Sequence, residues 1–293
     1  MTWKRIATAA ILIPVVVALV LYASTIIVAI VLAAIILLAL FEYFALGDAI
    51  GHRAYRLWTA FCALLILYAQ WLSTAVRWGD FGGIIYPAHL ARFLIRFFPR
   101  AEDAIILFVF GIAALTLATK RPLVEALPSA GISSSALLLV AFPLTYAVRL
   151  HAISSEGPRL LLFALVIIWA SDTTAYFVGR SFGKTPFAQH LSPKKTWEGA
   201  IAGFFGSLLV AVAFSHWLSI PLAHLLAMAA VGNIAGQVGD LLESAYKRSS
   251  GIKDSGSLLP GHGGILDRID ALILTFPVLW YYWVLFYSPS ITQ

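Results

Sequence analysis

Two pairs of carboxylates near the carboxyl end of the chain could hold a hard metal ion. Asp240 and Glu243 stand three residues apart in one apolar stretch, and Asp267 and Asp270 repeat that spacing where the next stretch begins. Residues three apart on a helix share a face, and carboxylates at membrane depth commonly mark functional sites. The spacing predicts a metal site. Simpler alternatives are a Glu243–Lys247 surface pair and acidic residues favoured at a helix amino terminus.

A glycine-rich turn, PGHGG at residues 260–264, precedes the second carboxylate pair. Glycine lets a backbone approach a ligand closely, and successive N–H groups can form an anion-binding nest. The turn therefore favours phosphate binding near the carboxylates. His262 could bind phosphate, move a proton or cap the turn, and the residues alone do not choose among these roles.

A second polar stretch carries adjacent lysines, Lys194 and Lys195, between the hydroxyl residues Ser192 and Thr196. Lysine binds phosphate as a point charge, so this pattern suits a triphosphate, although a charge cluster that only sets membrane topology is the alternative. Asp172 precedes the stretch and is expected either to bind metal or to form hydrogen bonds within the bundle. Together these groups favour a metal-dependent phosphate enzyme that acts on a membrane substrate.

The elements that must position these groups are membrane helices. Of 293 residues, 61% are hydrophobic and 12% are charged, and the mean hydropathy of +0.90 excludes an ordinary soluble domain. The apolar stretches are long enough to cross a bilayer. We therefore expect an all-α polytopic integral membrane protein that forms a single domain over residues 1–293. The nine predicted spans are residues 6–23, 25–46, 55–72, 104–119, 133–150, 160–178, 200–217, 222–246 and 266–287.

The distribution of basic residues predicts the orientation of these spans. With a cytoplasmic amino terminus, most of the 20 Lys and Arg residues and every lysine fall on the cytoplasmic side, as the positive-inside rule requires. That side receives the two polar segments 179–199 and 247–267. Residues 151–293 are thus the predicted catalytic half, and residues 1–150 are mainly scaffold. Arginines among aromatic residues at 87–98 suggest an interfacial helix, with a plain loop as the alternative.

Three segments together resemble the signature of the phosphatidate cytidylyltransferases. They are SAYKR at 244–248, KD at 253–254 and LPGHGGILDRID at 259–270. The segments 172–176, 192–196 and 239–244 are also similar to that family, so the distinctive match covers about residues 171–270. Tyr246 departs from the pattern, which has an apolar residue or Phe there.

The resemblance implies an Mg²⁺-dependent enzyme of the bacterial inner membrane that joins CTP to phosphatidic acid, giving CDP-diacylglycerol and pyrophosphate. It also implies an active site facing the cytoplasm, K⁺ as a second cation, a homodimer and no nucleic-acid partner. Asp240 and Asp267 would bind metal, with Glu243 and Asp270 as auxiliary ligands. The residues that the resemblance assigns to catalysis are Asp240, Asp267, Lys247 and Arg268. Those expected at the substrates are Asp172, Ser192, Lys194, Lys195, Thr196, Ser244, Arg248, Lys253, His262 and Gly263.

Two other classes of function compete with this hypothesis. A transporter would also place carboxylates inside the membrane, but it does not account for two polar loops rich in Lys and Gly on one side. A CDP-alcohol phosphotransferase or a lipid kinase is another lipid-phosphate enzyme. The phosphotransferase would be expected to show several aspartates at fixed spacing around a Gly and an Ala-Arg, and the sequence lacks that pattern.

Overall fold

The predicted membrane spans are helices in the computed structural model, which describes residues 2–78, 93, 100–153, 156–256 and 263–288. A chain in lipid must satisfy its backbone hydrogen bonds internally, and helices do so within one segment. Eight helical spans in the described residues are long and apolar enough to cross a membrane, and a shorter apolar helix covers Ala10–Tyr22. Each of the nine predicted spans coincides with one of these, so the predicted fold class is confirmed.

The helices extend slightly beyond most of the predicted bounds. In the first half of the chain they are α1 Thr2–Tyr22, α2 Thr25–Ala49, α3 Arg56–Trp78, α5 Ala101–Ala118, the 3₁₀ turn η1 Leu123–Glu125, α6 Ala126–Ser135, the π-helix η2 Ala136–Ala141, α7 Phe142–Leu144 and α8 Tyr146–His151. In the second half they are α9 Gly157–Phe182, α10 Trp197–Phe214, α11 Leu222–Ser249, α12 Leu266–Tyr282 and the π-helix η4 Trp283–Tyr287.

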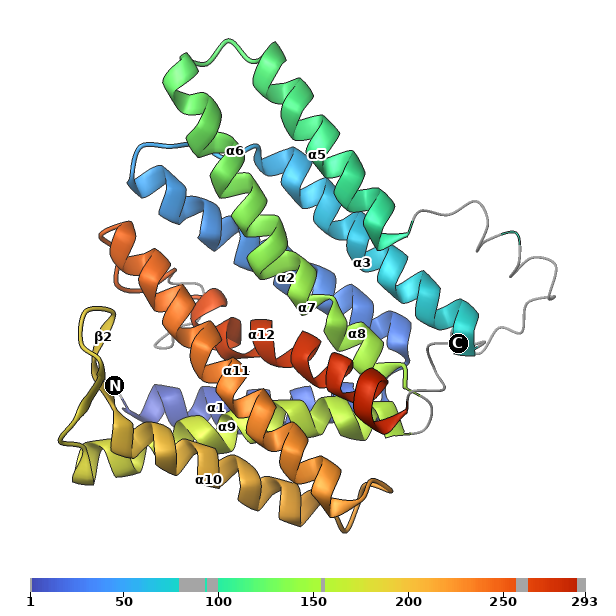
Figure 1. Cartoon of the computed structure of the whole chain (residues 1–293), viewed down its shortest axis with the longest axis vertical. Helices are drawn as coiled ribbons and strands as arrows, with labels where there is room; N and C mark the ends of the chain where they lie inside the picture. The colour runs from blue at the N-terminus through green and yellow to red at the C-terminus, as the bar shows by residue number, and fades with distance from the viewer. Residues whose placement is uncertain (1, 79–92, 94–99, 154–155, 257–262, 289–293) are drawn as a thin grey trace.

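The helices form two neighbouring groups. In Figure 1, α2, α3, α5 and α6 lie above, and α9, α10 and α11 lie below, with α12 between the groups. The α2–α3 connection, the end of α9 and the end of α11 all lie toward the same side of the bundle (Figure 1). The two polar segments that carry the predicted site residues are therefore at one end of the molecule.

The predicted polar segment 179–199 contains a small β-hairpin. Strands β1 Pro186–Ala188 and β2 Ser192–Thr196 pair antiparallel, with Pro186 opposite Thr196 and Ala188 opposite Ser192. Thr196 then caps α10, because its Oγ1 accepts the Gly199 N–H at 3.2 Å. The hairpin thus fixes the direction of the two lysines in β2. Of the predicted interfacial helix 87–98, only Phe93 lies within the described residues, and His262 lies outside them.

Glycines let the site-bearing helices approach closely. A Cβ atom on Gly239 of α11 would lie 2.5 Å from the carbonyl oxygen of Asp270 on α12, and one on Gly199 of α10 would lie 2.9 Å from that of Ala175 on α9. Small residues at crossings are the usual means by which membrane helices pack, because lipid supplies no hydrophobic drive between them. The crossing at Gly239 brings the two predicted carboxylate pairs together.

We expect Gly239→Ala to destabilise the protein, since its methyl group would overlap the backbone of α12. Overpacking typically costs about 1–3 kcal/mol, which outweighs the gain of about 1 kcal/mol in helix propensity. The thermal unfolding midpoint in detergent measures the effect. Gly131→Ala on α6 is the control, because no described heavy atom lies within 4 Å of a Cβ there. Equal stabilisation by both substitutions would contradict the tight crossing.

Candidate functional site

A pocket of about 560 Å³ opens between α9, α10, α11 and the β-hairpin. Five of the predicted substrate and metal residues line this hairpin pocket: Asp172, Lys194, Lys195, Thr196 and Asp240. The ammonium group of Lys195 forms an ion pair with the Asp240 carboxylate. Asp172 lies within electrostatic range of Asp240, Lys195 and Arg268. The pocket therefore combines cationic side chains with carboxylates, the two kinds of group that could bind phosphate and a metal.

Two amide side chains that the sequence analysis missed also line the pocket, where α9, α10 and α11 meet. Asn233 Nδ2 donates to Ser171 Oγ at 2.7 Å and to Ser207 Oγ at 2.9 Å, and Gln237 Nε2 donates to Asn233 Oδ1 at 2.7 Å. The two bonds to the serines join α11 to α9 and to α10, and the bond from Gln237 orients Asn233 within α11. The sequence does contain a signal for these two amides, because residues 233, 237 and 240 are spaced so that they share one face of a helix in an apolar stretch.

The second carboxylate cluster is built around one lysine. Lys247 Nζ lies 2.6 Å from Glu243 Oε2 and 2.6 Å from Asp267 Oδ1. An ammonium group between two carboxylates offsets part of the desolvation that all three suffer on burial. Glu243 Oε1 is also buried, and within the described residues it has no hydrogen-bond partner. This cluster, the lysine bridge, joins α11 to the start of α12.

The glycine turn before α12 binds the Asp267 carboxylate. Asp267 Oδ2 accepts the Gly264 N–H at 2.9 Å and the Ser255 N–H at 3.1 Å. Gly263 has φ +80°, a left-handed conformation that favours glycine. In this structure, one amide of the predicted anion nest therefore serves an anion of the chain itself, as expected for a carboxylate in the first turn of a helix. Contact of Gly263 with substrate stays a prediction.

Glu42 of α2 is a site residue that the sequence analysis missed. Its side chain is only 2% exposed, and it accepts hydrogen bonds from Ser255 Oγ at 3.0 Å, Ile265 N at 2.9 Å and Leu266 N at 2.8 Å. The two amides lie at the start of α12, where a helix has no internal acceptors for its N–H groups. Glu42 thereby fixes both the start of α12 and Ser255, which in turn binds Asp267.

Asp270 connects the hairpin pocket with the lysine bridge. Its carboxyl group interacts electrostatically with Asp240 and Asp172 of the hairpin pocket and with Glu243 of the lysine bridge. It follows Asp267 by one turn of α12, next to the crossing at Gly239. The four predicted metal ligands thus occupy two adjoining clusters at one helix crossing.

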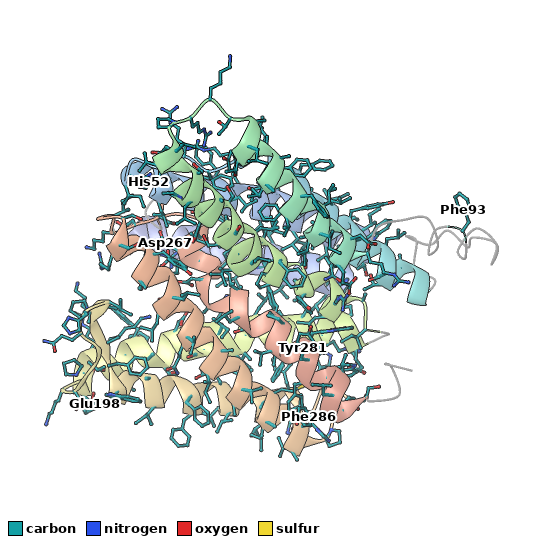
Figure 2. The ribbon with its side chains drawn as sticks, turned by 45° about the horizontal axis from the view of Figure 1, so that its top comes forward. His52, Phe93, Glu198, Asp267, Tyr281 and Phe286 are labelled. Atoms are coloured by element: carbon teal, nitrogen blue, oxygen red, sulfur yellow. The ribbon has the colours of Figure 1, made fainter. Side chains whose placement is uncertain are left out.

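Four other predicted site residues, Ser244, Arg248, Lys253 and Arg268, lie on α11, on α12 or in the segment between them. Arg248 Nε donates to the Leu191 carbonyl at 3.1 Å, which ties the end of α11 to the hairpin. Ser244 is buried on α11, while Lys253 and Arg268 are exposed. Figure 2 shows Asp267 and Glu198, the latter at the start of α10, toward the same end of the bundle, away from Tyr281 and Phe286.

The carboxylates of the two clusters lie apart from one another but have the chemistry that a hard metal ion needs. Within the described ranges, no three His, Cys, Asp or Glu side chains lie close enough together to hold a metal ion by themselves. Asp240 and Asp267 each pair with a different lysine. The donors nevertheless fit Mg²⁺, which needs only one or two carboxylates when substrate phosphates and water supply the other ligands. The buried Glu243 Oε1 is a further oxygen of the right chemistry.

Comparison with known proteins gives a consistent result. Residues 3–286 match the model of the family described as the Cytidylyltransferase family. A phosphatidate cytidylyltransferase of Haemophilus influenzae is 35% identical over 224 residues, which are 73% of this chain and 75% of the relative. That of Bacillus subtilis is 39% identical over 158 residues, or 53% and 59% of the two chains. One from Staphylococcus aureus strain COL is 44% identical over 127 residues, or 43% and 49%. The aligned segments thus span about half to three quarters of these relatives.

We expect Glu42→Gln to loosen the start of α12, because the amide offers one acceptor oxygen where the carboxylate offers two. A buried donor that loses its partner costs about 1–3 kcal/mol. The thermal unfolding midpoint should fall, and trypsin should cut faster after Lys253 in the neighbouring loop. Glu102→Gln, at an exposed position in the first turn of α5, is the control. Equal tryptic rates for both variants would show that Glu42 does not hold the loop.

Proposed function

Since this chain belongs to the cytidylyltransferase family, we propose that it transfers CMP from CTP to phosphatidic acid, giving CDP-diacylglycerol and pyrophosphate. The observation that carries the proposal is the hairpin pocket, in which Lys194 and Lys195 meet Asp172 and Asp240. Its walls are helices long and apolar enough to cross a membrane. A soluble triphosphate and a lipid phosphate could therefore meet there.

The proposed chemistry is an in-line displacement at the α-phosphorus of CTP. An oxygen of the lipid phosphate forms the new P–O bond, the bond between the α-phosphorus and the bridging oxygen breaks, and pyrophosphate leaves with that electron pair. The lipid phosphate is already an anion at neutral pH, so the reaction needs neither a nucleophilic side chain nor a strong base. Lys194, Lys195 and Arg268 would stabilise the charge that moves onto the leaving group.

We propose that Asp240 and Asp267 hold Mg²⁺, with Glu243 and Asp270 as auxiliary ligands. When bound, the ion supplies charge neutralisation at the triphosphate and polarises its phosphoryl oxygens. The lysine bridge holds Glu243 and Asp267 together through Lys247, and the ion pair with Lys195 orients Asp240. K⁺ is proposed as a second cation near the same carboxylates.

The membrane setting and assembly are also proposals. We infer a bacterial inner-membrane protein with a cytoplasmic amino terminus, and an active site that takes CTP from the cytoplasm. The clustering of lysines in segments at one end of the bundle supports this orientation, because basic loops remain cytoplasmic. We further propose a homodimer, on the family resemblance alone.

The purified protein in phosphatidic acid vesicles should release labelled pyrophosphate from CTP and form a labelled lipid when the label is in the cytidine. ATP and GTP should release much less. Removal of divalent ions with a chelator should stop the reaction, and Mg²⁺ should restore it. Ion or metabolite flux across the same vesicles without pyrophosphate release would instead support a transporter.

We expect Asp240→Asn to lower turnover by about 10²- to 10³-fold, the loss typical when one preorganised electrostatic group is removed. The same assay measures it, with the thermal unfolding midpoint as a check of folding and Glu102→Gln as the control. Asp240 is a cleaner test than Asp267, because Asp267 also accepts two backbone hydrogen bonds. We expect Asp267→Asn to abolish turnover. Near-normal turnover of a folded Asp240→Asn protein would contradict the proposed role of Asp240 as a metal ligand.

A further inference from the structure

A second, larger pocket lies where α2 meets α3, beside the end of α5. Its volume is about 930 Å³, and it shares no lining residue with the hairpin pocket. Three arginines, Arg53, Arg56 and Arg121, line it together with one carboxylate, Asp48. We call it the arginine pocket. Its charged groups play no part in the chemistry proposed above.

Arg121 is held in place by the protein. Its Nη1 donates to the Arg53 carbonyl at 2.6 Å and to the buried Ser129 Oγ at 3.2 Å. The guanidinium carbon also lies 5.1 Å from the centre of the Tyr55 ring, within range of a cation–π interaction. Within the described residues, nothing accepts a hydrogen bond from Arg121 Nε or Nη2. Those donors are therefore fixed in position for an anion.

The pocket retains an excess of positive charge. Asp48 pairs with Arg56, and the nearby Glu125 binds His52 at 3.1 Å. Arg53 is exposed, and its side chain has no acceptor among the described residues. Three guanidinium groups thus line the pocket with a single carboxylate. Guanidinium groups bind phosphate through paired hydrogen bonds, so the charge and geometry suit a phosphate group.

Apolar side chains lie beside these charges. Leu57 is 90% exposed and Leu115 is 37% exposed, and both line the pocket. A soluble phosphate compound has no apolar part that could pack against these leucines, whereas a phospholipid carries acyl chains next to its phosphate. His52, in the α2–α3 connection, lies toward the same end of the bundle as Asp267 (Figure 2). The pocket therefore lies at the end of the membrane helices, where headgroups are found.

We propose that the arginine pocket binds the phosphate of an anionic membrane phospholipid, with an acyl chain along Leu57 and Leu115. Basic pockets at the cytoplasmic ends of membrane helices bind lipid headgroups in this way. The site is separate from the hairpin pocket. It would hold a phospholipid as a bound ligand and not as a reactant.

Native mass spectrometry of the full chain in detergent tests the proposal, with phosphatidylglycerol and phosphatidylcholine as the probes. We expect Arg53→Gln/Arg56→Gln to weaken binding of phosphatidylglycerol at one site by at least about tenfold and to leave phosphatidylcholine unchanged. Arg121 is kept, because it supports the fold. Arg100→Gln/Arg159→Gln is the control, since it removes the same charge from positions at the start of α5 and of α9.

A second variant guards against loss of folding. Leu57→Glu alters an exposed side chain and places a negative charge in the pocket, so it should also reduce phosphatidylglycerol binding while the thermal unfolding midpoint stays the same. The proposal is wrong if both pocket variants bind phosphatidylglycerol as tightly as the control does. Displacement of the lipid by free glycerol phosphate at similar concentration would likewise overturn it, because the ligand would then be a soluble anion.

Discussion

Carboxylates among membrane helices require counterions or hydrogen-bond donors close by, and this requirement organises the whole site. Glu42 receives three donors from the start of α12 and the loop before it. Glu243 and Asp267 share Lys247, and Asp240 takes Lys195 from the hairpin. These hydrogen bonds and ion pairs join elements that are distant in sequence, so parts of α2, α11, α12 and the hairpin lie together at one end of the bundle. Because an unpaired buried charge costs several kcal/mol, these contacts position the functional groups and hold the helices in register.

The two lysines that neutralise the carboxylates come from different kinds of structure. Lys247 lies on a long helix and bridges to the next one, while Lys195 lies on a short strand that reaches over the pocket. The hairpin is anchored to α11 at two points, by Lys195 and by the bond from Arg248 to Leu191. Cationic side chains are thereby placed beside carboxylates. One pocket, formed by membrane-length helices and a short hairpin, thus holds both kinds of group.

Much of this structure follows from simple patterns in the sequence. Length and hydropathy predict the nine spans, because lipid permits few other structures, and the spacing of the carboxylates predicts that Asp240 and Glu243 share a helix face. The hairpin could not be predicted, since its strands are too short to show alternation. The role of Glu42 depends on a contact with Ile265, 223 positions away, and periodicity holds no information about such pairs. A lone acid in an apolar stretch was the available signal, and it was overlooked because the amino half was interpreted as scaffold.

The contact between Glu42 and the loop before α12 also bears on how such enzymes can be recombined. Gly256 and Gly264 both lie against the Glu42 carboxylate, with no room for larger residues. The loop and α2 are therefore complementary surfaces, although one belongs to each half of the chain. A chimera that exchanges only the carboxyl-terminal half between relatives would separate the acid from its matched loop. Functional hybrids should need α2 and α12 to be inherited from the same parent.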